Sequence, residues 1–250
     1  MLLEGIGWFM AKGSPQFEST VWTQVLVAAR EPDSSAGALA LSRLCQVYWF
    51  PIYAHIRRLG LPVADAEDLT QGFFVHILQN GFLARADPGM GRFRNYLLGA
   101  VRHFLANDRE RQGAQRRGGR AQKVSIDTDL AEVWLAAEPT VATDATVSFD
   151  RAWAVSVLKA AMAMLEAEHL GLGKGHLFHA VKEFLQRSAS PGEYDEVARA
   201  LQMSKGAVAA AVHRMTARFG ELVKKVVRDS VADADMAEEE LTYLMRVLRR

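Results

Sequence analysis

Apolar residues recur at helical rather than strand spacing along most of this 250-residue chain. In residues 65–78, for example, Leu69, Phe73 and Ile77 follow one another at intervals of four, which places them on one face of a helix. Strand-like alternation is scarce, and half of all residues are hydrophobic, enough for one large or two small cores. We therefore expect an all-α protein with two helical domains, an acidic linker between them and a C-terminal helix.

The expected domain boundaries follow changes in composition along the chain. Residues 17–112 form a first helical block, and residues 113–150 form a linker that ends in an acidic, Thr- and Ala-rich run. A short helix at about residues 129–137 is expected within this linker. Residues 151–230 form a second helical block, and residues 231–250 form a C-terminal amphipathic extension whose apolar stripe needs a packing partner.

The net charge of +1 conceals a strong local pattern of charge. Residues 85–123 contain ten Arg and Lys and three acidic residues, whereas residues 124–150 contain six acidic residues and no Arg or Lys. Clustered cations attract phosphate groups. The basic segment therefore predicts a nucleic-acid-binding surface.

An acidic stripe marks the polar side of the helix expected at residues 65–78. Asp65, Asp68 and Gln71 follow at intervals of three, on the side away from the apolar residues. Acids near a helix start are also favourable in themselves, so a solvated face is one interpretation. The functional interpretation is an acidic stripe that docks on a basic partner surface.

The next expected helix begins near residue 91 and combines cations with aromatic residues. Its apolar side is predicted to be core, while its arginines would grip phosphates and its aromatic rings would stack on unpaired bases. The candidate nucleic-acid contacts are Arg92, Arg94, Asn95, Tyr96, Arg102, His103, Asn107 and Arg109. The loop at residues 80–93 is a plausible place to hold an extruded base. The alternative is that the aromatics are all core and the arginines serve solubility.

Residues 194–219 show the spacing of apolar residues that is typical of a helix-turn-helix. Small Ala198 suits a close helix crossing, and Ser204 is a good N-cap for the second helix. The expected inner face is Tyr194, Val197, Ala198, Leu201, Val208, Ala211, Val212, Met215 and Phe219. The candidate DNA contacts are Ser204, Lys205, Ala207, His213, Arg214 and Arg218. An ordinary helical hairpin remains the alternative from this segment alone.

Taken in order, the segments DAEDLTQGFF, GRFRNYLLGAVRHFLAND and YDEVARALQMSKGAVAAAVHRM resemble a bacterial RNA polymerase sigma factor. The resemblance is to the two-domain, extracytoplasmic-function type, in the version common in planctomycetes, and it covers residues 17–248. It implies that Asp65, Asp68 and Gln71 bind core RNA polymerase. It also implies that the basic helix engages and melts the minus-ten promoter element, and that the helix-turn-helix reads the minus-thirty-five element.

The chain departs from this family pattern at the helix-turn-helix. Gln202 stands where the turn usually carries glycine, so Gln202 itself would have to adopt the strained backbone. Ala209 and Thr216 stand where Arg or Lys is frequent in the family. We therefore expect a loosely specified upstream element, with the polymerase bringing the helix to DNA.

Enzymatic and metal-binding functions find little support in the sequence. The residues show neither a Ser/His/Asp set nor a pair of carboxylates placed for catalysis. His176 and His179 lie one helical turn apart but lack a completing ligand, and the single cysteine, Cys45, is expected to be a buried inert thiol. We expect a cytoplasmic, non-enzymatic protein without cofactor, metal or membrane contact, with core polymerase and promoter DNA as partners.

Two other classes of function stay open. One is a free-standing helix-turn-helix regulator, which would bind duplex DNA as a dimer without polymerase. The other is a regulatory polymerase-binding protein with a degenerate promoter-reading domain, which the alanine-rich second helix favours. The C-terminal extension at residues 231–250 is expected to make a regulatory contact, and an anti-sigma or other regulatory protein is a further candidate partner.

Overall fold

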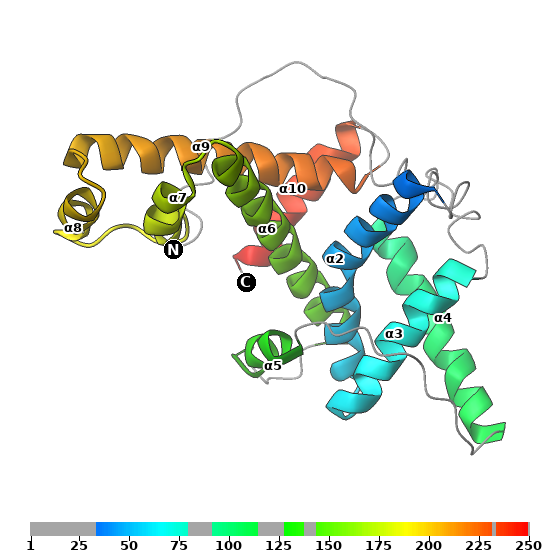
Figure 1. Ribbon diagram of the computed structural model, residues 1–250. Coiled ribbons are helices and arrows are strands. Elements are labelled where there is room, and N and C mark those ends of the chain that lie inside the picture. Colours follow the sequence, from blue (N-terminus) through cyan, green and yellow to red (C-terminus); the bar gives the residue numbers. More distant parts are fainter. Residues whose placement is uncertain (1–33, 80–91, 115–127, 138–143, 232–233, 250) are drawn as a thin grey trace. The chain divides into compact units, whose positions relative to one another are not determined.

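The computed structural model describes residues 34–79, 92–114, 128–137, 144–231 and 234–249, and every regular element in these ranges is a helix (Figure 1). The all-α prediction is confirmed for this part of the chain. The elements are α2 (Ser35–Arg57), α3 (Val63–Gln79), α4 (Phe93–Ala114), α5 (Thr128–Ala137), α6 (Ala145–Gly171), α7 (Gly175–Val181), the short 3-10 helix η3 (Lys182–Leu185), α8 (Glu193–Ala200), α9 (Lys205–Asp229) and α10 (Ala234–Leu248).

The described residues divide into two compact units. The first, the amino-terminal unit, holds the described part of residues 18–156 together with the described part of 228–240. The second, the carboxy-terminal unit, holds residues 157–227 and the described part of 241–250. The segment expected as a linker contributes α5 to the amino-terminal unit, and α10, in the expected extension, is divided between the two units.

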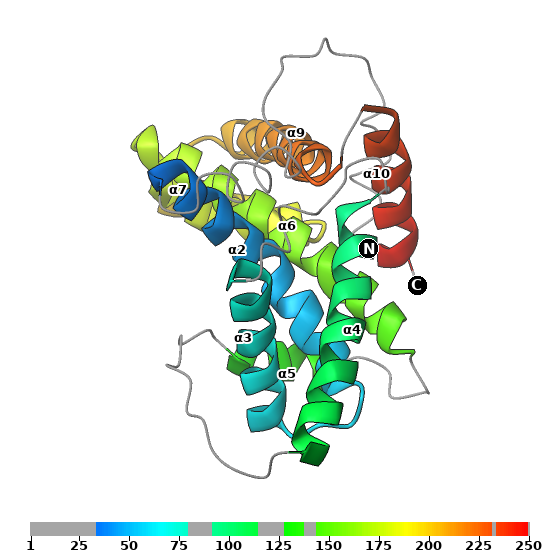
Figure 2. The same ribbon diagram turned by 90° about the vertical axis from the view of Figure 1, so that its right-hand side faces the viewer.

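Helices α2, α3 and α4 build the core of the amino-terminal unit and lie side by side (Figures 1 and 2). The ring of Tyr48 on α2 meets the ring of Phe93 on α4 edge to face, with 5.3 Å between centroids. The apolar spacing seen in the sequence explains the packing, because one stripe from each helix turns inward. The fully buried large residues are Tyr48, Ile52, Tyr53, Ile56, Phe73, Ile77, Phe93, Leu97, Phe149 and Trp153.

Helix α5, expected at residues 129–137, is confirmed at Thr128–Ala137, and its Glu132 carboxylate binds two side chains of α2. Glu132 accepts hydrogen bonds from the Tyr53 hydroxyl (2.6 Å) and from Arg57 Nε and Nη2 (2.7 and 2.8 Å). The bidentate Arg57 contact, with the Tyr53 hydrogen bond, lowers the pKa of Glu132. One carboxylate of the acidic segment therefore stabilises the packing of α5 on α2.

Cys45 lies half-buried on α2 rather than fully buried. Burial raises the pKa of its thiol to about 11. At neutral pH the group is therefore protonated, which agrees with the expectation of an inert thiol.

Candidate nucleic-acid interface

The turn between α8 and α9 has the backbone that the sequence predicted. Gln202 adopts a left-handed conformation with φ +53°, the only positive φ among the described residues other than glycine. The amide of Met203 donates to the carbonyl of Ala198 (2.9 Å) and that of Gln202 to the carbonyl of Arg199 (3.3 Å). This pair of bonds is a Schellman motif, which normally favours glycine at the left-handed position.

Replacing Gln202 with glycine should raise the free energy of unfolding by about 0.5–1 kcal/mol, because the strain of a side chain in the left-handed region exceeds the added entropy of glycine. Urea denaturation followed by circular dichroism measures the difference. Gln186→Gly is the matched control, since Gln186 has φ −107° and gains nothing from glycine. Equal shifts in the two variants would argue against strain at Gln202.

Helix α9 begins as expected, with Ser204 as its cap. The Ser204 Oγ accepts a hydrogen bond from the amide of Ala207 (3.2 Å). The predicted inner face is confirmed on α9, where the buried members are Val208, Ala211, Val212, Met215 and Phe219. On α8 only Ala198 is buried, while Tyr194, Val197 and Leu201 are half-buried. The segment therefore packs as two helices joined by a tight turn, as a helix-turn-helix does.

The carboxylate of Glu193 fixes the loop that leads into α8. Arg187 donates two hydrogen bonds to it, both at 2.7 Å, and the amide of Ser190 donates a third at 2.6 Å. These bonds, with Arg187 first, lower the pKa of Glu193 to about 2. The entry to the helix-turn-helix is thereby held by charge-assisted bonds on the surface.

The outward side of α9 carries the predicted DNA contacts, but two of its cations already have anionic partners. Lys205 Nζ lies 2.8 Å from Asp195 Oδ2. Arg218 donates to both oxygens of Glu168, at 2.9 and 2.5 Å. His213 and Arg214 are exposed, Ser204 serves as the cap and Ala207 is half-buried. Exposed pairs of this kind are weak, so a phosphate can replace the carboxylate.

Helix α3 presents the predicted acidic stripe to solvent. Asp65 and Asp68 are exposed and Gln71 is half-buried. On the opposite side Thr70 is fully buried and donates its hydroxyl to the carbonyl of Ala66 (2.6 Å). The stripe is thus a surface that a basic partner can reach.

Helix α4 places its predicted contacts in different environments. Asn95, Arg102 and His103 are exposed, and Tyr96 and Asn107 are half-buried. Arg102 Nη2 donates to the Thr146 hydroxyl at 2.6 Å. The side chain of Arg109 and the loop at residues 80–91 lie outside the described residues. The solvent-facing side of α4 is therefore polar, and it carries part of the predicted set of nucleic-acid contacts.

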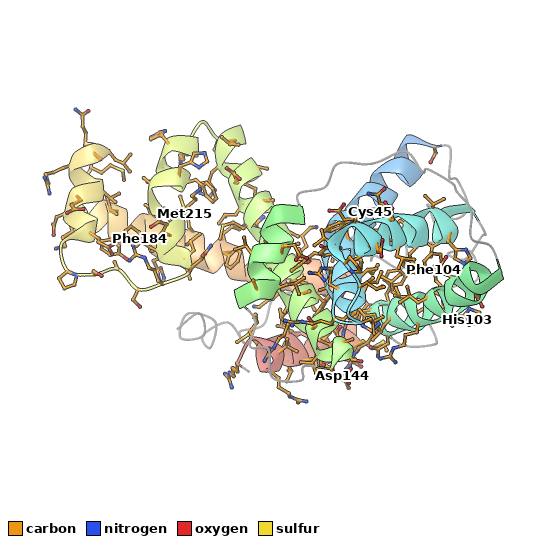
Figure 3. The ribbon with its side chains drawn as sticks, turned by 90° about the horizontal axis from the view of Figure 1, so that it is seen from below. Cys45, His103, Phe104, Asp144, Phe184 and Met215 are labelled. Carbon is orange, nitrogen blue, oxygen red and sulfur yellow. The ribbon has the colours of Figure 1, made fainter. Side chains whose placement is uncertain are left out.

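Phe104 on α4 packs against α3, whereas the preceding His103 lies on the outer side of α4 (Figure 3). The ring centroid of Phe104 is 5.6 Å from that of Phe73 and 5.4 Å from that of His76. The interpretation of these aromatics as core thus holds for Phe104 and for the fully buried Phe93. Tyr96 and Phe104 are both half-buried, but the Phe104 ring packs on α3, so Tyr96 is the better candidate for stacking.

The structure corrects the expectation that Arg94 faces DNA. Arg94 is 5% exposed, pairs with Asp150 on α6 and with Glu240 on α10, and lies over the Trp153 ring at 5.1 Å. Arg94 Nε donates to Glu240 Oε1 at 2.5 Å. Its position follows from helical spacing, because buried Leu97 is one turn further along the same face. Helical spacing therefore predicts the inner position of Arg94, whereas its basic residue type alone suggested a contact with DNA.

Sequence reasoning also missed the two carboxylates that α10 contributes. Glu240 is 1% exposed and contacts both Arg94 and Arg92, whose Nε lies 2.9 Å from Glu240 Oε2. Glu239 contacts Arg92 Nη2 at 2.9 Å. Nothing local in the sequence marks these pairs, because the partners lie about 147 residues apart.

Comparisons with protein-family models, with curated proteins and with solved structures found no match for this chain. Within the described ranges, no helix is long and apolar enough to cross a membrane. The same described residues contain no group of three or more His, Cys, Asp or Glu side chains that could hold a metal ion. His179, one of the histidines weighed as a ligand, instead lies 3.6 Å from Glu166.

Proposed function

We propose that this chain is a sigma-type transcription initiation factor that binds bacterial core RNA polymerase and directs it to promoter DNA. The observation that carries the proposal is the acidic stripe of α3, formed by the exposed Asp65 and Asp68 and the half-buried Gln71. A helix-turn-helix by itself suits many regulators. An acidic stripe followed along the same chain by a polar, partly basic helix and then a helix-turn-helix suits a factor that must hold both polymerase and DNA.

Each surface supports one part of this role. The carboxylates of α3 would meet a basic surface of the polymerase, which fixes the register of docking. On α4, Arg102 and His103 would contact the backbone of the opened strand, and Tyr96 would offer a ring for base stacking. The exposed side of α9, with His213 and Arg214, would enter the major groove.

Weak upstream specificity follows from the composition of α9. Ala210 is exposed and Ala209 half-exposed where a DNA-reading side chain would be useful, and Lys205 and Arg218 hold carboxylates. Bidentate readers of base edges are therefore few. Docking on the polymerase would supply most of the binding free energy, and α9 would add a modest share.

These ion pairs favour a second candidate, a polymerase-binding regulator whose promoter-reading unit has decayed. The two candidates differ in what α9 contributes. Promoter-directed transcription by reconstituted polymerase separates them when wild type is compared with a His213→Ala, Arg214→Ala variant. A lower output from the variant supports the sigma-type factor, whereas equal output with intact polymerase binding supports the decayed unit.

Asp68→Arg should abolish co-elution of the protein with bacterial core RNA polymerase in size-exclusion chromatography. A charge reversal at a docking stripe replaces attraction by repulsion, and such changes cost several kcal/mol. Glu196→Arg is the matched control. Glu196 is an exposed acid on α8, and its replacement by arginine changes the net charge by the same amount as Asp68→Arg. If neither wild type nor control co-elutes while the protein alone shifts duplex DNA, a free-standing regulator is the better description.

A further inference from the structure

The first half of α10 lies against the start of α4 through charged groups. Glu239 and Glu240 from α10 contact Arg92, each at 2.9 Å, and Glu240 also contacts Arg94. Arg92 immediately precedes the first residue of α4, where the predicted nucleic-acid contacts begin. The carboxyl-terminal helix therefore occupies guanidinium groups at the edge of the proposed DNA-binding surface.

The charges in this cluster do not favour an added phosphate. Two guanidinium groups, of Arg92 and Arg94, face three carboxylates, of Asp150, Glu239 and Glu240, which gives a net charge of −1 when all are ionised. A DNA phosphate at Arg92 would lie close to the carboxylates of Glu239 and Glu240, which already contact its guanidinium. Phosphate binding at Arg92 is consequently opposed by these carboxylates, of which Glu239 is the exposed one.

The two arginines differ in how readily they can change partner. Arg94 and Glu240 are 5% and 2% exposed in their side chains, and Asp150 and Trp153 enclose Arg94 from the other side. This part is an anchor, since a buried pair is costly to break. Arg92 is 24% exposed and Glu239 is 71% exposed, so their contact is open to solvent and to competing anions.

We propose that α10 is an autoinhibitory element, which occupies Arg92 with carboxylates and so weakens the binding of single-stranded DNA to α4. The proposal rests on the proposed function, in which α4 contacts promoter DNA. The Arg94–Glu240 pair holds α10 in place, and the Glu239–Arg92 contact is the part that phosphate displaces. Relief follows when a DNA phosphate takes the place of Glu239 on the Arg92 guanidinium.

The test is the affinity of the full-length protein for a short fluorescein-labelled single-stranded DNA of mixed sequence, measured by fluorescence anisotropy over a range of salt concentrations. Glu239→Gln removes the exposed one of the two carboxylate charges that contact Arg92, while keeping the side-chain shape and the Glu240 contact. Glu238→Gln is the control, since Glu238 is an exposed neighbour in α10 and loses the same charge. Glu239→Gln should bind about threefold to tenfold more tightly than Glu238→Gln, the effect of about one charge-assisted contact.

The salt dependence supplies a second readout. Each additional phosphate contact on a single strand steepens the plot of log affinity against log salt by about 0.7, so Glu239→Gln should show a steeper slope than Glu238→Gln. Equal affinities and slopes for the two variants would overturn autoinhibition. Arg92→Gln and Arg102→Gln test the underlying function separately. If both weaken binding while the glutamate variants agree, α4 binds DNA and only the autoinhibition fails. If no folded form binds, the assignment of single-stranded DNA binding to α4 fails and the autoinhibition fails with it, while polymerase binding is judged by the Asp68→Arg experiment.

Discussion

Replacing Arg94 with alanine should lower the free energy of unfolding of the amino-terminal unit by about 3–5 kcal/mol. The substitution would take from the carboxylates of Asp150 and Glu240 the guanidinium that they share, and Glu240 would keep only its contact with Arg92. Removing one member of a buried ionic cluster leaves uncompensated charge, and that cost exceeds the loss of any surface pair. The contact of Arg94 with the Trp153 ring is lost as well.

Urea denaturation followed by tryptophan fluorescence and circular dichroism measures this loss. Arg102→Ala is the control on the same helix, because Arg102 is exposed and its removal should change stability by no more than about 0.5 kcal/mol. A triple variant with Arg94→Met, Asp150→Leu and Glu240→Leu should recover most of the stability, since an apolar cluster of similar volume carries no buried charge. An Arg94→Ala protein as stable as Arg102→Ala would refute the buried cluster.

Phe73→Ala should cost a similar amount, about 3–5 kcal/mol, for a different reason. Phe73 is fully buried and its ring contacts Phe74 and Phe104 at centroid distances of 5.9 and 5.6 Å. Alanine would leave a cavity between α3 and α4 in addition to the lost transfer free energy. Thermal and urea unfolding of the purified variant measure the loss.

Phe104→Ala is the informative partner of that variant. Phe104 is half-buried, so its truncation should destabilise the unit less than Phe73→Ala does. Because its ring packs on α3, Phe104→Ala should change DNA binding only through stability. A variant that keeps its stability but loses affinity for single-stranded DNA would instead place Phe104 in the binding surface.

Local spacing predicted much of the fold. The strained backbone at Gln202 was expected from the family resemblance, whereas the helices, the short α5 and the buried face of α9 follow from residues close together in sequence. Such features depend on helical periodicity and turn chemistry, both of which a single sequence displays. The exposure of the acidic stripe on α3 followed in the same way, from its position opposite the apolar residues.

Pairs distant in sequence were not predicted. Arg94 was assigned to DNA because it is basic, although its helical spacing from Leu97 places it on the inner face. Its partners Asp150 and Glu240 lie 56 and 146 residues away, and no local pattern connects them. The acidic segment was likewise expected to be a free linker, yet Glu132 and Asp150 are both paired with arginines. Charge patterning indicates a need for a partner without saying which partner satisfies it.

The protonated, half-buried thiol of Cys45 has a consequence for how the motions of α2 can be followed. Thiol reagents attack the thiolate, and a pKa of about 11 keeps that form scarce while the helix is packed. Reaction therefore waits for local opening, when the sulfur regains the acidity of a solvated cysteine. Since the chain has one cysteine, the rate at which a thiol reagent labels the Cys45 sulfur reports the rate of opening of α2.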